Sequence, residues 1–181
     1  MGPPEKHRDR YQTRFAIDPF AVSLDDGKQT WFVVDPARTV GIDLLFDDQA
    51  TRRRVLATNP ATREDMRDAA HALFAKDGKP VSVIRDSGGF VTQRVVAHMV
   101  NIASDICQQQ ICTPHDLELA VTLGLGYPMG PLALGDQLGP DNVLETLFNL
   151  QTVYGDPRYR PSPWLRRRGA IGLSLKHTES H

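Results

Sequence analysis

Cysteine is scarce in this chain of 181 residues, and neither sign of charge dominates. The two cysteines, Cys107 and Cys112, lie in a segment with a helical pattern, so we expect buried or half-buried free thiols rather than a disulfide. Free thiols are typical of a reducing cytoplasm. A zinc site needs two more soft ligands nearby, so we expect no metal. The 21 basic and 22 acidic residues give no electrostatic reason to expect nucleic acid or an acidic membrane surface as a partner.

Long hydrophobic runs and common catalytic motifs are also missing. No apolar run approaches the roughly 20 residues that span a bilayer. No hydrophobic stretch follows the polar N-terminal residues as it does in a secretory signal, so we expect a cytoplasmic protein. The sequence has no Walker, HExxH or GxSxG pattern. In its glycine-rich segment, residues 124–130, the third glycine is one position too far along for a dinucleotide loop, which favours a helix–loop–helix connection.

The first half of the chain has the pattern of a small α/β unit after a polar tail at residues 1–13. Two short apolar runs flank Asp25-Asp26-Gly27, which predicts a hairpin between residues 21 and 34. Three further strands are expected, over residues 39–46, 54–58 and 79–85.

A helix is expected between the last two of these strands. Thr62 is its predicted N-cap, with Asp65 as an approximate capping-box partner, and Gly78 is its predicted C-cap. This strand–helix–strand order favours a parallel sheet.

The second half of the chain is predicted to be entirely helical. A helix over residues 90–110 is indicated by apolar residues at helical spacing: Val91, Val95, Met99, Ile102 and Ile106. Together with the other apolar residues of this helix, they exceed what one core-facing side needs, so we expect a homodimer. Thr113-Pro114 predicts a helix start, and further helices are expected over residues 131–138, over residues 141–154 and after Ser162-Pro163. We interpret the run Arg166-Arg167-Arg168 as a solvated helix face.

Two segments of the second half resemble the C-terminal helical domain of the 3-hydroxyacyl-CoA dehydrogenases. DSGGFVTQRV (residues 86–95) is similar to the family's D-x-P-G-F-x-x-N-R. TPHDLELAVTLGLGYPMGPLALGDQLG (residues 113–139) is similar to its P-x-D-I-D, G-x-G-x-P-M-G-P and D-x-x-G-L-D motifs, in the same order. PSPWL (residues 161–165) resembles its final helix. The resemblance covers residues 39–175, because residues 39–86 look like the last strands and helix of the family's Rossmann domain.

The resemblance implies an α+β fold in two parts. A small α/β remnant of a Rossmann sheet is expected over residues 14–86. An all-α domain of the kind found in this family and in 6-phosphogluconate dehydrogenase is expected over residues 87–175, with a tail at residues 176–181.

The resemblance also implies an NAD-dependent enzyme, but the sequence departs from the family at the catalytic His–Glu dyad. Asp43 stands at the position of the histidine, and Val55 stands at the position of the glutamate that orients it. A carboxylate at position 43 is a poor base for a hydroxyl proton, and a valine cannot orient one. The family's NAD fingerprint belongs to an earlier strand and helix than those that this sequence matches. We therefore expect no catalytic residue and no bound NAD.

The resemblance implies that the acyl part of the substrate meets five residues: Gln93, Tyr127, Pro128, Met129 and Pro131. Gln93 replaces the family's asparagine and keeps an amide on a longer side chain. For Tyr127 and Met129 an alternative stays open, in which both side chains pack beneath the following helix.

We thus interpret the chain as the substrate-cleft and dimerisation portion of a 3-hydroxyacyl-CoA dehydrogenase, an oxidoreductase of fatty-acid β-oxidation or related acyl-CoA metabolism. The expected setting is the second copy of this region in a longer two-copy enzyme, beside a catalytic N-terminal portion. The isolated chain is expected to be inactive and to bind acyl-CoA weakly. Two alternatives are a free-standing, non-catalytic acyl-CoA-binding or protein-interaction module and an unrelated helical scaffold.

Overall fold

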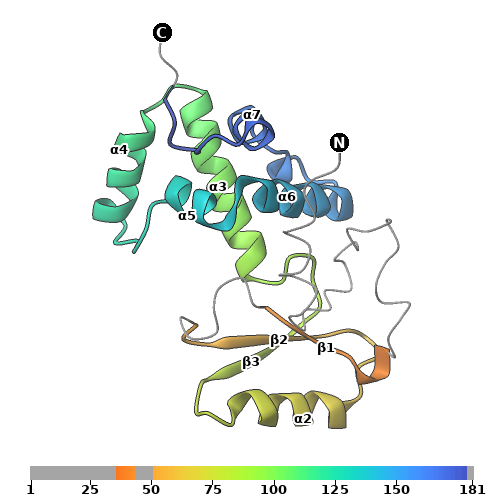
Figure 1. Cartoon of the computed structure of the whole chain (residues 1–181). Helices are drawn as coiled ribbons and strands as arrows, with labels where there is room; N and C mark the ends of the chain where they lie inside the picture. The colour runs from red at the N-terminus through yellow and green to blue at the C-terminus, as the bar shows by residue number, and fades with distance from the viewer. Residues whose placement is uncertain (1–35, 44–50, 179–181) are drawn as a thin grey trace. The chain divides into compact units, whose positions relative to one another are not determined.

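The computed structural model describes residues 36–43 and 51–178 and divides the chain into two compact units, Met1–Thr92 and Gln93–His181 (Figure 1). The hairpin predicted between residues 21 and 34 lies outside the described residues. The first unit carries a small sheet and the second is helical, which confirms the predicted α+β fold class. None of the described helices is long and apolar enough to cross a membrane.

The first unit is built on a three-stranded sheet in the order β1 (Val40–Ile42), β2 (Arg54–Thr58) and β3 (Val81–Arg85). β2 and β3 are parallel and are joined through α2 (Glu64–Ala75), the crossover that a parallel pair requires. β1 runs antiparallel to β2, so the prediction of a parallel sheet is wrong for this pair. Eleven residues separate β1 from β2, whereas a parallel pair needs a crossover of a dozen or more residues, usually with a helix, and an antiparallel pair needs no crossover. Figure 1 shows α2 along one face of the sheet.

The ends of α2 differ from the prediction. Its N-cap is Arg63, which makes no side-chain capping bond, so the prediction of Thr62 is wrong. The Thr62 hydroxyl is used in the preceding turn, where it donates to the Thr39 carbonyl at 2.9 Å and accepts from the Asn59 N–H at 3.0 Å. The C-cap is Lys76 rather than Gly78. Gly78 takes a left-handed conformation (φ 83°) just beyond it and turns the chain toward β3.

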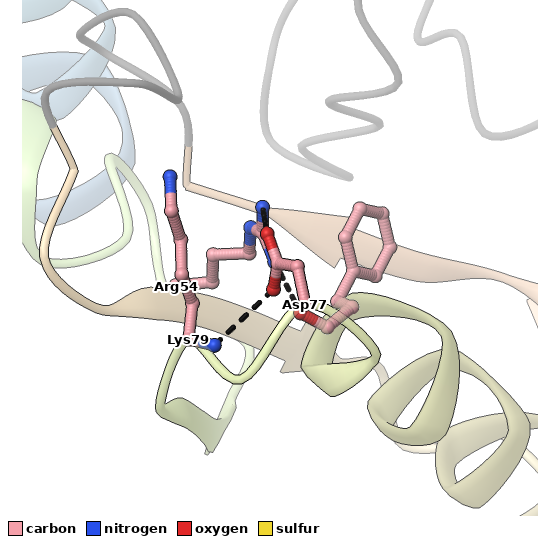
Figure 2. A network of polar contacts seen from close by, with 4 residues as sticks. Arg54, Asp77 and Lys79 are labelled. Atoms are coloured by element: carbon pink, nitrogen blue, oxygen red, sulfur yellow. Dashed lines mark hydrogen bonds and ion pairs between the residues drawn. The ribbon is translucent and has the colours of Figure 1, made fainter.

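An ion pair joins the start of β2 to the turn after α2 (Figure 2). The two terminal guanidinium nitrogens of Arg54, Nη1 and Nη2, donate to the Asp77 carboxylate at 2.7 Å, and Nη1 also donates to the Phe74 carbonyl. Asp77 accepts the backbone N–H of Lys79 as well, at 3.2 Å. The Arg54 side chain is buried, and its hydrogen bonds lower the pKa of Asp77 to about 2. The contact therefore fixes the connection between α2 and β3 with a bidentate, charge-assisted pair.

The second unit consists of helices whose starts follow the predicted signals. Thr113 accepts the Asp116 N–H at 3.1 Å as the cap of α4, and Ser162 accepts the Trp164 N–H at 3.3 Å as the cap of the last helix. The helices are α3 (Thr92–Gln108), α4 (Pro114–Leu119) with the π-helical continuation η4 (Ala120–Gly124), α5 (Pro131–Leu138), α6 (Pro140–Tyr154), the short 3-10 helix η5 (Pro157–Tyr159) and α7 (Pro163–Ile171).

The buried face of α3 is not the stripe that identified this helix in the sequence. Its buried apolar residues are Val96, Ala97, Val100, Ala103 and Cys107. Three residues of the predicted stripe are exposed instead: Val91, just before α3, is 46% exposed, Val95 is 58% exposed and Ile102 is 47% exposed. The helix thus carries two apolar faces, and the second lies open at the surface of the described chain.

The C-terminal segment of the second unit is held by side chains of α5 and α7. Asp136 accepts the Ser174 hydroxyl at 2.6 Å and the Leu175 N–H at 2.7 Å, while the Trp164 indole donates to the Leu175 carbonyl at 2.9 Å. Arg168 is buried, stacks on Trp164 and donates to the His177 carbonyl at 2.8 Å. The prediction of a solvated arginine face is therefore wrong for Arg168, because a planar guanidinium can stack on an aromatic ring and still donate hydrogen bonds.

Candidate functional site

The structure brings together the two positions that the family resemblance assigns to the dyad. The register of β1 and β2 ends with Ile42 opposite Leu56, and its extension by one residue beyond β1 sets Asp43 opposite Val55. The Asp43 N–H donates to the Val55 carbonyl at 2.9 Å, which continues the antiparallel ladder by one residue. Opposed residues in such a ladder point to the same face of the sheet, with their Cβ atoms about 5 Å apart. Positions 43 and 55 therefore have the placement that a pair of cooperating side chains requires.

The carboxylate at position 43 is used as a helix cap. Asp43 is 6% exposed, and its Oδ2 accepts the backbone N–H groups of Val91 at 3.1 Å and Thr92 at 2.7 Å. Thr92 is the first residue of α3, so these are among the N–H groups that a helix start leaves without partners. A negative charge is also favourable at this end of a helix. The other oxygen, Oδ1, is buried and has no hydrogen-bond partner within residues 36–43 and 51–178.

Val55 offers no polar atom in its side chain to a neighbour across the strand pair. A general acid–base pair needs a titrating group and a second group that orients it. Here the oxygen of Asp43 that makes hydrogen bonds is occupied by two backbone donors, and the group opposite is a hydrocarbon. The two positions thus hold a carboxylate that accepts two backbone N–H groups and a hydrocarbon side chain.

The five residues assigned to a substrate wall lie in the second unit. Gln93 is the second residue of α3 and is half-buried. Tyr127 and Met129 are 40% and 39% exposed on the loop between η4 and α5, Pro128 between them is exposed, and Pro131 is buried as the first residue of α5. No hydrogen bond links Gln93 to this loop in the described part of the chain. The loop follows a helix, so the predicted helix–loop–helix connection is confirmed.

The sequence does not predict the role of one residue at the base of this loop. Glu118 on α4 accepts the N–H groups of Leu132 and Ala133, at 2.8 and 3.3 Å, and so caps α5 from a neighbouring helix. The signal in the sequence is indirect, because Gly130 at the N-cap position of α5 has no side chain and a cap must come from elsewhere.

The two cysteines are free thiols, Cys107 buried and Cys112 half-buried, as predicted. Burial raises the pKa of the Cys107 thiol to about 11, which keeps it protonated and unreactive at neutral pH. The described residues contain no group of three His, Cys, Asp or Glu side chains that could hold a metal ion.

The cap made by Asp43 gives the first prediction. Asp43→Ala removes the acceptor of two N–H groups and should lower the free energy of unfolding by about 0.5–2 kcal/mol, the usual cost of a lost helix cap. Asp43→Asn keeps a carbonyl oxygen in the same place and should recover most of this loss. Urea denaturation followed by circular dichroism measures both variants. Equal stability of the Ala variant and the parent chain would contradict the capping role.

Comparison with known proteins identifies the family of this chain. Residues 89–180 match the family model described as "3-hydroxyacyl-CoA dehydrogenase, C-terminal domain". The chain is 43% identical over 128 residues to the 3-hydroxyadipyl-CoA dehydrogenase of Escherichia coli K12, covering 71% of this chain and 27% of that protein. It is 33% identical over 132 residues to a probable 3-hydroxybutyryl-CoA dehydrogenase of Bacillus subtilis, covering 73% and 46%.

A solved structure agrees with these matches. The (S)-3-hydroxybutyryl-CoA dehydrogenase of Ralstonia eutropha superposes with a TM-score of 0.72 at 27% identity, over 80% of this chain and 53% of that one. The chain thus spans between about a quarter and a half of the length of these relatives. The family model covers the helical unit, and the resemblance drawn from the motifs is confirmed. The chain belongs to the 3-hydroxyacyl-CoA dehydrogenase family and contains its C-terminal domain.

Proposed function

We propose that this chain is the substrate-cleft and dimerisation portion of an NAD-dependent 3-hydroxyacyl-CoA dehydrogenase and that it has no turnover by itself. The reaction of the whole enzyme would be oxidation of a 3-hydroxyacyl-CoA to a 3-oxoacyl-CoA, a step of fatty-acid β-oxidation or related acyl-CoA metabolism. The observation that carries the proposal is the pairing of Asp43 with Val55 at the two dyad positions.

The chemistry of the reaction explains why this pairing matters. NAD supplies the hydride acceptor when it is bound, and the protein must supply a base for the hydroxyl proton. The described residues do not fit NAD. The glycine-rich loop at residues 124–130 follows a helix rather than a strand, and the Gly88-Gly89 turn between β3 and α3 lacks the GxGxxG spacing. The resemblance assigns the base to position 43, where the carboxylate already accepts two backbone N–H groups. Proton abstraction and NAD binding are therefore assigned to a separate, N-terminal portion of a longer enzyme.

The part left to this chain is contact with the acyl-CoA. Tyr127, Pro128 and Met129 present apolar surface on a loop stiffened by two prolines, and the Gln93 amide can hydrogen-bond a carbonyl oxygen. One wall of contacts must offset several kcal/mol of lost translational freedom, so the affinity of the isolated chain would be weak. The presence of Asp43 and Val55 at the dyad positions also favours the alternative, a free-standing, non-catalytic module that binds acyl-CoA or another protein.

Titration of the isotope-labelled chain with butyryl-CoA tests this assignment. We expect chemical-shift changes that cluster on Gln93 and residues 127–131, because these groups would face the acyl part. Free CoA at the same concentrations is the control for contacts with the nucleotide end alone. Absence of shifts even at high butyryl-CoA concentration would leave the loop a structural turn and would remove the substrate part of the proposal.

Dimerisation is assigned to the open face of α3. Val95 and Ile102 lie two turns apart on one side of the helix, and both are about half exposed, although apolar side chains gain free energy by leaving water. We propose a homodimer in which this face packs against its copy, in the cytoplasm, where Cys107 and Cys112 remain free thiols.

Sedimentation across a concentration series should give a mass near twice the 20.1 kDa of the chain. The double variant Val95→Glu/Ile102→Glu should be monomeric, because two charges would be buried in the contact. Leu123→Glu, on the separate η4 segment and 80% exposed, is the matched control and should still dimerise. A parent chain that stays monomeric as concentration rises would contradict the assignment.

A further inference from the structure

Hydrogen bonds fix both ends of the loop that carries Tyr127 and Met129. On the η4 side, the N–H groups of Leu125 and Tyr127 donate to the Val121 carbonyl at 3.1 and 3.5 Å. On the α5 side, the backbone enters the helix at Gly130-Pro131, where Glu118 reaches over from α4. Between these two points the loop projects with its apolar side chains exposed.

Glu118 supplies what the local sequence of α5 cannot. Gly130 has no side chain to cap the helix, and Pro131 has no N–H of its own. The first free donors of α5 are the N–H groups of Leu132 and Ala133, and the two carboxylate oxygens of Glu118 take one each, at 2.8 and 3.3 Å. The Glu118 carboxylate therefore occupies the positive end of the α5 dipole, so an anionic group of a ligand cannot bind there.

The fit between Glu118 and Gly130 is close. A Cβ built on Gly130 would lie 2.3 Å from Cδ and Oε2 of Glu118 and 2.5 Å from Oε1. Real carbon atoms do not approach a carboxylate so closely, so the carboxylate lies directly against the backbone of the residue that follows Met129. The position of Glu118 and the path of the loop are therefore coupled.

We propose that Glu118 is a positioning residue, which holds the loop over residues 125–130 so that Tyr127 and Met129 face an acyl-CoA. Contact between the loop and an acyl-CoA rests on the proposed function, whereas the role of Glu118 in holding the loop does not. Glu118 touches no substrate atom in this assignment and acts only through the backbone of α5. Loss of its carboxylate should release the loop at one end while the other end stays bonded to Val121.

The test compares Glu118→Ala with Asp136→Ala in the full chain. Asp136 is the matched control, because its carboxylate also accepts two donors in the same unit, the Ser174 hydroxyl and the Leu175 N–H, but these belong to the C-terminal segment. Glu118→Gln keeps one acceptor oxygen and should give an intermediate result. The readouts are the NMR signals of the Met129 methyl and the Tyr127 ring without ligand, followed by titration with butyryl-CoA.

We expect Glu118→Ala to move both loop signals and to weaken butyryl-CoA binding about five-fold, the factor that corresponds to one lost cap. Asp136→Ala should lower the melting temperature but leave the signals and the affinity unchanged. Unchanged loop signals in Glu118→Ala, or equal changes in both variants, would overturn the proposal. If the parent chain binds no butyryl-CoA, the substrate assignment fails, and the ligand-free signals still decide whether Glu118 positions the loop.

Discussion

The hydrogen bonds from Val91 and Thr92 to the carboxylate of Asp43 are the interaction on which this account depends. They join the end of β1 to the first turn of α3, two elements far apart in the sequence. They also occupy a side chain at the position where the family places its catalytic histidine. A side-chain oxygen that accepts two backbone N–H groups at a helix start stabilises that start. Position 43 therefore has a structural role, as the cap of this helix start.

Each of the two units is stabilised by contacts that do not involve Asp43 or Val55. In the first unit, Arg54 and Asp77 close the turn between α2 and β3. In the second, Asp136 and Trp164 hold the C-terminal segment, and Leu175 is fully buried. The helical unit keeps the loop of the matched motif G-x-G-x-P-M-G-P with its apolar side chains exposed.

The sequence predicts those features whose cause is local. Thr113, Pro131 and Ser162 mark helix starts correctly, because a cap or a first-turn proline acts within a few residues of its own position. Strand β2 has the predicted bounds, and the two dyad positions, taken from the resemblance, prove to be paired across a strand ladder.

Features that depend on distant partners are not predictable in this way. The Thr62 hydroxyl bonds to Thr39 instead of capping α2. Arg168 stacks on Trp164 of its own helix, but its hydrogen bond to the His177 carbonyl requires the C-terminal segment to fold back. On α3, both apolar faces have helical spacing, so tertiary packing alone decides which one is buried. Asp43 and Glu118 cap helices to which they do not belong, so no fixed sequence spacing between cap and helix could have predicted them.

The most direct test of the central claim is the activity of the isolated chain. Calorimetric titration with NAD should give no binding heat, and a steady-state assay with a short 3-hydroxyacyl-CoA should form no NADH above the buffer blank. An intact 3-hydroxybutyryl-CoA dehydrogenase under the same conditions is the positive control. Turnover above the blank would show that Asp43, or a group outside the described residues, abstracts the proton, and would contradict the account.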